Sequence, residues 1–183
     1  QAIIRAHRDG ATVMGICGGY QMMGVEVLDP DHVEGTIERL PGLGLLPVST
    51  SMTGEKVTRQ DTFHLAVTDV DAGPMQGYEI HMGETKPVQD ASPSPLNIFA
   101  DGHPDGCFVD AKCMGTYIHG VLDNLPVIDH LLRHSLSTSA RSLGGARGEV
   151  SLFTFKEEQY NRLADHVRQY VDIDRLYQIL SDD

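Results

Sequence analysis

The sequence contains no tryptophan, and only 6% of its 183 residues are aromatic. Basic residues are also scarce: 14 Lys and Arg stand against 26 Asp and Glu, which gives a formal net charge of −12. A surface this acidic repels phosphate backbones and anionic lipid, so we expect neither a nucleic-acid partner nor a membrane partner. No apolar run approaches the ~20 residues that a transmembrane helix needs.

Cysteine is rare as well, with three residues at uneven spacing, which excludes a disulfide framework and favours a cytoplasmic protein. Cys107 and Cys113 form no CxxC pair, so we interpret them as strand or loop residues. His130 and His134 lie four residues apart, but we expect no metal site there or elsewhere. At ~150 residues per domain the length predicts one domain, and an apolar content of 40% is sufficient for its core.

Apolar runs and turn residues predict an α/β protein with alternating helices and strands. We expect helices over residues 2–7, 18–23 and 157–180 and one beginning near Pro126; strands over 12–16, 62–70, 77–82, 107–109 and 114–119; a turn-rich lead into a strand over 40–49; and loops over 86–95 and 135–148.

Gly15-Ile16-Cys17-Gly18-Gly19 has the pattern of a nucleophile elbow, with glycine two residues on either side of the nucleophile. A strained turn between strand and helix would expose the sulfur, and side chains at the flanking glycines would collide with backbone. The Gly18 N–H would point to the position of an oxyanion, and the helix N-terminus would favour the thiolate. The alternative is a buried cysteine in a glycine-rich turn.

A thiolate nucleophile needs a base, and nine histidines are present. His119 ends the apolar stretch that begins at Met114. Because the carboxyl ends of strands line the crevice of open α/β sheets, we expect His119 to face Cys17. His81, near the end of the 77–82 strand, is the competing candidate, unless it is a strand histidine bonded to backbone.

Three motifs resemble one enzyme family. Residues 15–24 (GICGGYQMMG) resemble the nucleophile turn of class I glutamine amidotransferases. Residues 77–85 (GYEIHMGET) and 115–124 (GTYIHGVLDN) resemble the cobyric acid synthase and cobyrinic acid a,c-diamide synthase branch, and residues 41–50 and 56–59 agree with it. The resemblance implies a flavodoxin-like fold with an open, mostly parallel sheet and flanking helices, apparently without its N-terminal strands.

The resemblance implies that Cys17 attacks the side-chain amide of glutamine, and that the γ-glutamyl thioester is then hydrolysed to glutamate. His119 would act as base and then as acid, Gly18 would donate to the oxyanion, and Gln21 would contact the amino-acid end of the substrate. It implies no cofactor in this domain. ATP and Mg²⁺ would belong to a synthetase domain that amidates a corrinoid acceptor, adenosylcobyrinic acid a,c-diamide, with the released ammonia.

The sequence departs from the wider amidotransferase pattern at the third triad position. Many class I members carry Glu two residues after the histidine, where this chain has Val121. The cobyric acid synthase branch generally lacks this Glu, so the departure agrees with the branch. Glu79 is a candidate for orienting His119, and an ordinary strand carboxylate is the alternative.

No GxxxxGK[ST] phosphate loop is present, so we expect the synthetase domain to lie outside this chain. Too few elements precede Cys17 for the family, and at ~30 residues per βαβ unit roughly 60 residues would be missing. We therefore interpret residues 1–183 as an N-terminally truncated amidotransferase domain. It would lack the second oxyanion donor and be weakly active alone.

Three other functions stay open at this point. A cysteine-dependent α/β-hydrolase shares the elbow and a later histidine, but GGYQ is not its motif. An inactive regulatory subunit would not need to retain Cys17 and His119. Cobyrinic acid a,c-diamide synthase is the nearest relative within the branch, and the GTYIHG form of residues 115–120 favours cobyric acid synthase.

Overall fold

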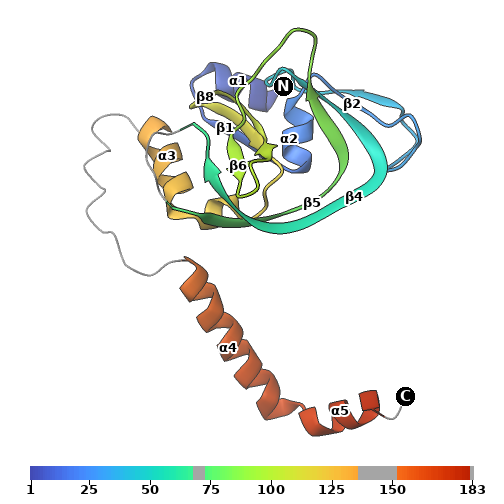
Figure 1. The fold of residues 1–183 in the computed structure, drawn as a ribbon, viewed down its shortest axis with the longest axis vertical. Coiled ribbons are helices and arrows are strands. Elements are labelled where there is room, and N and C mark those ends of the chain that lie inside the picture. Colours follow the sequence, from blue (N-terminus) through green and yellow to red (C-terminus); the bar gives the residue numbers. More distant parts are fainter. Residues whose placement is uncertain (68–72, 136–151, 182–183) are drawn as a thin grey trace. The chain divides into compact units, whose positions relative to one another are not determined.

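The computed structural model of the chain describes residues 1–67, 73–135 and 152–181. The chain forms two compact units, Gln1–Gly144 and Gly145–Asp183 (Figure 1). None of the helices in these described ranges combines the length and the apolar character that crossing a membrane requires.

The first unit combines short helices and short strands with two long strands that pair along their length (Figure 1). Its elements in chain order are α1 (Ala2–Arg8), β1 (Val13–Ile16), α2 (Gly18–Met23), β2 (Glu26–Leu28), β3 (Arg39–Pro41), β4 (Val48–Leu65), β5 (Met75–Pro87), β6 (Asn97–Phe99), β7 (Pro104–Asp105), β8 (Cys107–Asp110), β9 (Cys113–Thr116), the 3-10 helix η1 (Val121–Asp123) and α3 (Leu125–Ser135).

The strands form two open sheets. The smaller sheet has the order β1-β9-β8, in which β1 is parallel to β9 and β8 is antiparallel to it. The larger sheet has the order β3-β2-β4-β6-β7, and β5 also pairs with β4. The α/β class and the open sheets are confirmed.

The expected mostly parallel pairing is wrong for the described strands. Only β1–β9 and β2–β4 are parallel pairs among them, whereas β2–β3, β4–β5, β4–β6, β6–β7 and β8–β9 are antiparallel. For every antiparallel pair except β4–β6, whose strands are not consecutive, the physical reason is the length of the connection. A parallel pair needs a crossover of a dozen or more residues, and strands joined by shorter segments, such as β8 and β9, fold back as antiparallel pairs.

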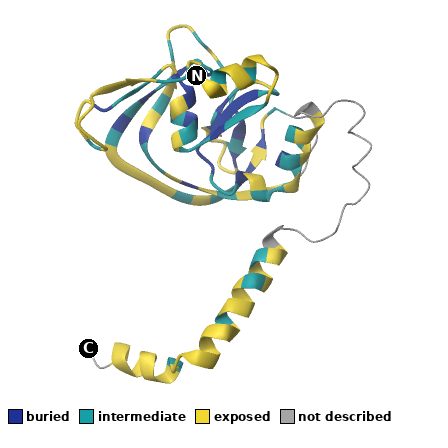
Figure 2. Cartoon of the chain, turned by 180° about the vertical axis from the view of Figure 1, so that it is seen from behind, coloured by how far each residue is buried: buried dark blue, intermediate teal, exposed yellow. Residues whose placement is uncertain are grey.

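The core consists of two groups of buried side chains. One lies under β4, β5 and α3, and its members are Phe63, Leu65, Met75, Leu96, Phe99, Met114, Ile118, Val121 and Val127. The other lies against α2, and its members are Tyr20, Met23, Leu46, Val48, Cys107, Cys113 and Tyr117. Figure 2 shows the buried residues concentrated on the short central strands. Cys107 and Cys113 are strand residues and are not bonded to each other, as expected.

Several predicted boundaries shift in the structure. The strand predicted over 62–70 belongs to the 18-residue β4, which ends at Leu65, and residues 68–70 lie outside the described ranges. The strand predicted over 114–119 ends at Thr116, because its parallel partner β1 ends at Ile16 opposite Thr116 and the pairing with β8 already stops at Gly115. The loop predicted over 135–148 falls almost entirely outside the described residues.

The second unit contains α4 (Leu152–Tyr170) and α5 (Ile173–Ser181) instead of the single helix predicted over 157–180. Asp172 explains the interruption. Its carboxylate accepts the Arg175 N–H at 2.9 Å, an N-cap interaction that begins a new helix. The apolar spacing alone did not reveal this cap.

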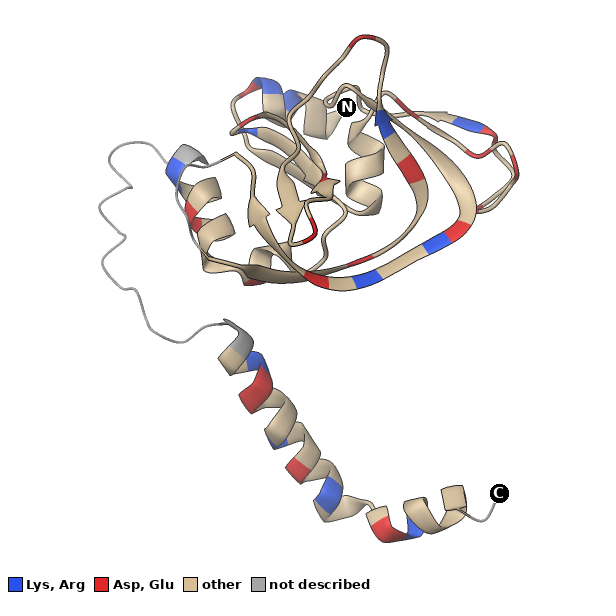
Figure 3. Cartoon of the chain, viewed as in Figure 1, with Lys and Arg blue, Asp and Glu red and all other residues tan. Residues whose placement is uncertain are grey.

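Basic and acidic residues both occur along the described ribbon (Figure 3). On the long strands, Arg59 of β4 lies between two carboxylates: its Nη2 atom is 2.5 Å from Asp61 and 2.9 Å from Asp101. Its guanidinium also lies 4.2 Å from the ring centre of Phe99. This cluster attaches the loop after β6 to β4.

Candidate active site

The strand, turn and helix predicted around Cys17 are confirmed. β1 ends at Ile16 and α2 begins at Gly18, so Cys17 is the single residue of the turn. Its φ of 52° and ψ of −116° lie outside the regions that side-chain-bearing residues favour. Such strain costs about 1–3 kcal/mol and is concentrated at functional sites. Gly18 is the first residue of α2, where an N–H has no partner within the helix.

The two glycines that flank Cys17 differ in what surrounds them. A Cβ at Gly15 would lie 2.7 Å from the Gly19 carbonyl oxygen and 2.7 Å from the Met23 sulfur. A Cβ at Gly19 would meet nothing within 4 Å, so the expected collision there is absent. Gly115, which pairs with Gly15 across β1 and β9, would overlap the Tyr20 ring if it carried a Cβ. Glycine is therefore required at the strand side of the turn, where α2 packs against β1 and β9.

This difference predicts opposite effects for two alanine substitutions. Gly15→Ala should lower the free energy of unfolding by about 1–3 kcal/mol, because the helix must move away from the strand. Gly19→Ala should leave it unchanged or raise it by up to about 1 kcal/mol, because alanine is the better helix residue. Urea unfolding of the two variants beside the wild type measures both changes. Equal destabilisation by the two substitutions would contradict the asymmetry of the turn.

One edge of β5 contacts three of the four side-chain-bearing residues predicted for the site, and the fourth, Glu79, is a residue of β5 itself. Tyr78 exchanges backbone hydrogen bonds with His119, with N–O distances of 2.7 and 3.2 Å. The Cys17 thiol donates to the Ile80 carbonyl, with 3.6 Å between sulfur and oxygen. The Gln21 side-chain amide donates to the Met82 carbonyl at 2.9 Å.

These contacts alternate along the strand for a geometric reason. Residues of an antiparallel pair direct both backbone groups alternately toward and away from the partner strand. The backbone N–H and carbonyl of Tyr78 bond to His119 and therefore point away from β4. By the same alternation, the backbone groups of Ile80 and Met82 also point away from β4. Residues two apart in a strand are separated by roughly 7 Å. The structure therefore brings Cys17, His119 and Gln21 to one short edge.

The His119 ring is held by stacking. It lies parallel to the Tyr78 ring, with 5.0 Å between the ring centres and 12° between the planes. Its Nε2 atom is buried and has no hydrogen-bond partner among the described residues. A buried imidazole nitrogen without a partner is available to accept a proton.

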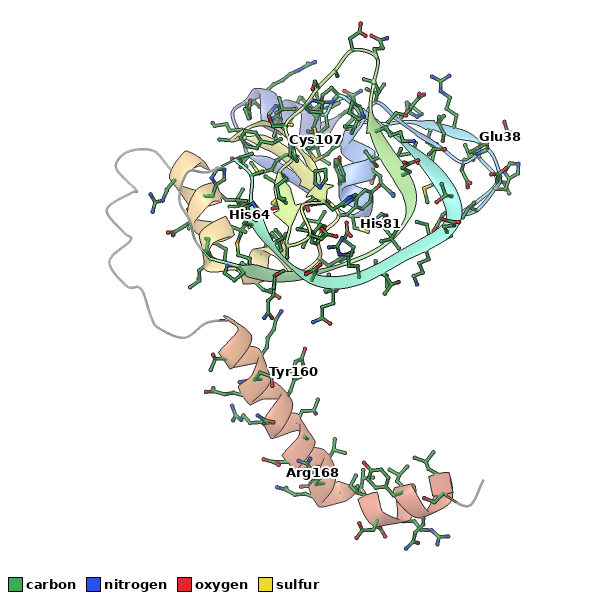
Figure 4. All side chains as sticks on the ribbon, in the orientation of Figure 1. Glu38, His64, His81, Cys107, Tyr160 and Arg168 are labelled. Atoms are coloured by element: carbon green, nitrogen blue, oxygen red, sulfur yellow. The ribbon has the colours of Figure 1, made fainter. Side chains whose placement is uncertain are left out.

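Glu79 and His81 lie on the other face of β5 from Tyr78. Glu79 Oε1 is 3.8 Å from His81 Nε2, and both side chains are buried. The other ring nitrogen of His81 lies 3.2 Å from the Gly83 carbonyl oxygen, and the ring stacks on Tyr117 with centres 3.7 Å apart. Figure 4 shows His81 on the inner side of the long strands. The Glu79 carboxylate thus contacts His81. The predicted role of Glu79 in orienting His119 stays a prediction.

Tyr117 connects the site to the strands beneath it. Its hydroxyl accepts from the Gln21 amide at 3.3 Å and is 2.6 Å from the Thr85 hydroxyl, which is 2.6 Å from that of Thr50. Burial raises the pKa of Tyr117 above its ordinary value. A neutral hydroxyl in this position fixes the Gln21 side chain beside Cys17.

Comparison with known proteins identifies the family of this chain. Residues 1–127 match the family model described as the CobB/CobQ-like glutamine amidotransferase domain. The chain belongs to this family. The resemblance stated from residues 15–24, 77–85 and 115–124 is therefore confirmed.

Several curated relatives of this amidotransferase domain share one name. Proteins named cobyric acid synthase from Bacteroides fragilis, Phocaeicola vulgatus and Parabacteroides distasonis are 60%, 56% and 45% identical to it. The matches cover 100%, 99% and 96% of this chain and 35%, 35% and 34% of the respective relatives. The chain thus spans about a third of the length of these relatives.

Sequence reasoning missed three residues of the amidotransferase site. Tyr78 stacks on His119, and the Tyr117 hydroxyl accepts from the Gln21 side chain. The carboxylate of the buried Asp105 accepts the backbone N–H of Tyr117. The available signal for the two tyrosines was their position inside the two histidine-containing motifs, residues 77–85 and 115–124. For Asp105 the signal was weak, because Pro104-Asp105-Gly106 has the composition of an ordinary turn.

Proposed function

We propose that this chain is the glutaminase part of a cobyric acid synthase, and that it supplies ammonia for the amidation of corrinoid carboxylates in cobalamin biosynthesis. Three facts support the proposal: the family of the chain, the shared name of its relatives, and the β5 edge that holds Cys17, His119 and Gln21 together. The last is the observation that carries the mechanism, because it joins a nucleophile, a base and a substrate-binding amide.

The first half of the reaction forms a thioester. His119 takes the thiol proton of Cys17, and the thiolate attacks the side-chain amide carbon of glutamine. The Gly18 N–H stabilises the oxyanion of the tetrahedral intermediate. When the intermediate collapses, the C–N bond breaks and His119 returns the proton to the leaving nitrogen, which departs as ammonia.

The second half restores the enzyme. A water molecule loses a proton to His119 and attacks the thioester carbon, again through an oxyanion beside Gly18. The C–S bond breaks, glutamate is released and Cys17 recovers its proton. We assign Gln21 to the amino-acid end of glutamine, because Met82 and Tyr117 hold its side chain in place.

The remaining chemistry is assigned to another part of the protein. ATP and Mg²⁺ would activate the corrinoid carboxylate in a synthetase domain, and we assign no residue of this chain to either of them. Adenosylcobyrinic acid a,c-diamide is the proposed acceptor. The amidotransferase domain then needs glutamine alone and no cofactor.

Two ammonia sources test this division of labour. In the full enzyme, Cys17→Ala should abolish corrinoid amidation with glutamine but leave amidation with ammonium chloride close to the wild-type rate, because free ammonia bypasses the thioester. Mass spectrometry of the corrinoid product in the presence of ATP and Mg²⁺ measures both. Glutamine-dependent amidation that survives the substitution would exclude Cys17 as the nucleophile. If the wild type amidates no corrinoid with either source, the proposed acceptor is wrong.

A further inference from the structure

A single peptide group lies between Cys17 and a buried carboxylate. The carbonyl oxygen of Thr116 accepts the Cys17 N–H at 2.9 Å. The next N–H along the chain, that of Tyr117, donates to Asp105 Oδ1 at 2.9 Å. Both bonds are made by the two ends of the same peptide plane, so the position of Asp105 is transmitted directly to the amide of Cys17.

Asp105 is itself fixed from three sides. It is 5% exposed, and its Oδ2 atom accepts from the Thr116 hydroxyl and, at 2.9 Å, from the Asn97 side-chain amide. The Thr116 hydroxyl in turn accepts the Ile118 N–H at 3.0 Å. Burial raises the pKa of Asp105 above its usual range, although the three donors oppose the change.

The end of β9 explains why a side chain is needed here. Beyond Thr116 the pairing with both β1 and β8 has ended, so the buried Tyr117 N–H has no strand partner and requires another acceptor. The same peptide must also hold the strained Cys17, whose φ of 52° persists only if its surroundings impose it. A hydrogen bond at one end of a peptide also polarises the other end, which strengthens the bond to Cys17.

We propose that Asp105 is a positioning residue for the nucleophile, whose carboxylate fixes the Thr116–Tyr117 peptide and through it the turn at Cys17. The inference rests on the proposed role of Cys17. Asp105 contacts neither Cys17 nor, by this account, the substrate. It acts by keeping the thiol at the β5 edge, and the anchor of Gln21 depends on the same segment through Tyr117.

Three substitutions separate the position of the acceptor from its charge. Asp105→Ala removes the acceptor, Asp105→Glu keeps the charge but moves it by one methylene, and Asp105→Asn keeps an oxygen in place without the charge. We expect Ala and Glu to lower kcat for glutamine hydrolysis by about 10- to 100-fold, the loss that a displaced reacting group produces. Asn should retain more activity than Ala or Glu, because its Oδ1 can still accept the Tyr117 N–H, but less than the wild type, because its NH2 group would face the Asn97 amide donor. KM should change less than kcat in every variant.

A second measurement does not depend on glutamine. Alkylation of Cys17 by iodoacetamide at neutral pH, followed by peptide mass spectrometry, should slow by about tenfold in the Ala and Glu variants and little in the Asn variant. Circular dichroism gives the folded fraction to which each rate is referred. Asp101→Ala is the matched control, because Asp101 also accepts a backbone N–H, that of His103 at 2.9 Å, and lies in the same connection.

The outcomes are distinct. Wild-type alkylation and turnover per folded molecule in both Asp105→Ala and Asp105→Glu would overturn the inference and leave Asp105 a purely structural residue. If Asp105→Ala does not fold, the contrast between Glu and Asn decides in the same way. A full-length wild-type enzyme that hydrolyses no glutamine would refute the proposed function, whereas the alkylation rates would still test the positioning of Cys17.

Discussion

Replacement of Cys17 by alanine should lower kcat for glutamine hydrolysis by about 10⁴- to 10⁶-fold, the range found when the nucleophile of a catalytic unit is removed. The reason is that the thioester route has no substitute for the sulfur, since Gly18 and His119 only assist its attack. Ammonia release measured with a coupled dehydrogenase checks the rate. Circular dichroism of the variant should match the wild type, because Cys17 is only partly buried and its described side-chain contact is with the Ile80 carbonyl.

Covalent labelling gives an independent check of the same residue. A diazo-ketone analogue of glutamine should label Cys17 and spare the other two cysteines. Burial raises the pKa of both Cys107 and Cys113 to about 11, so neither supplies thiolate at neutral pH. Peptide mass spectrometry locates the label, and excess glutamine should protect against it. Labelling of the Cys17→Ala variant at the wild-type rate would show that the analogue reacts elsewhere.

His119→Ala should lower kcat by about 10²- to 10⁴-fold, the usual contribution of a general acid–base residue. The Nε2 atom of His119 is the basis of this expectation, because it has no hydrogen-bond partner in the described part of the chain and can take the thiol proton without giving one up. Added imidazole should restore part of the activity by occupying the space beside Tyr78. The measurement is kcat as a function of pH, with and without imidazole.

His81→Ala is the matched control for this prediction. His81 stacks on Tyr117 and pairs with Glu79, so its loss should disturb the network under Gln21 and raise KM more than it lowers kcat. A fall in kcat that is larger for His81→Ala than for His119→Ala would exchange the roles of the two histidines. Tyr78→Phe preserves the stacked ring and should leave kcat near the wild-type value.

The features predicted well from the sequence are those that depend on neighbouring residues. The turn at Cys17 follows from its flanking glycines and the short apolar run before them. The helix predicted over 2–7 is α1, and Gly10 after it has a positive φ of 96°. Cys17 and His119 were paired because each follows an apolar run at the end of a predicted strand. Their separate contacts with β5 could not be predicted, because these depend on which edge of that strand is left unpaired.

The remaining features depend on contacts between distant segments. The expectation of a mostly parallel sheet failed because β4 and β5 form one long antiparallel pair over 48–65 and 75–87, whose length exceeds what short apolar runs indicate. The expectation that a side chain at position 19 would collide with backbone was wrong, because α2 packs closely against β1 at Gly15 and not at Gly19. Asp105 could not be assigned, because the groups that surround it come from β6 and from the end of β9.

The β5 edge also limits which sequence changes related domains can accept at positions 78–82. The contacts at Ile80 and Met82 are made by backbone carbonyl oxygens, which every residue carries, and Tyr78 contributes both its N–H and its carbonyl oxygen. Side chains at positions 80 and 82 can therefore drift without moving the site. An insertion or deletion of one residue between 78 and 82 should disrupt the site, because it would turn the peptide groups that follow it toward β4 and remove their contacts with Cys17 or Gln21, while the Tyr78 contact with His119 stays in place.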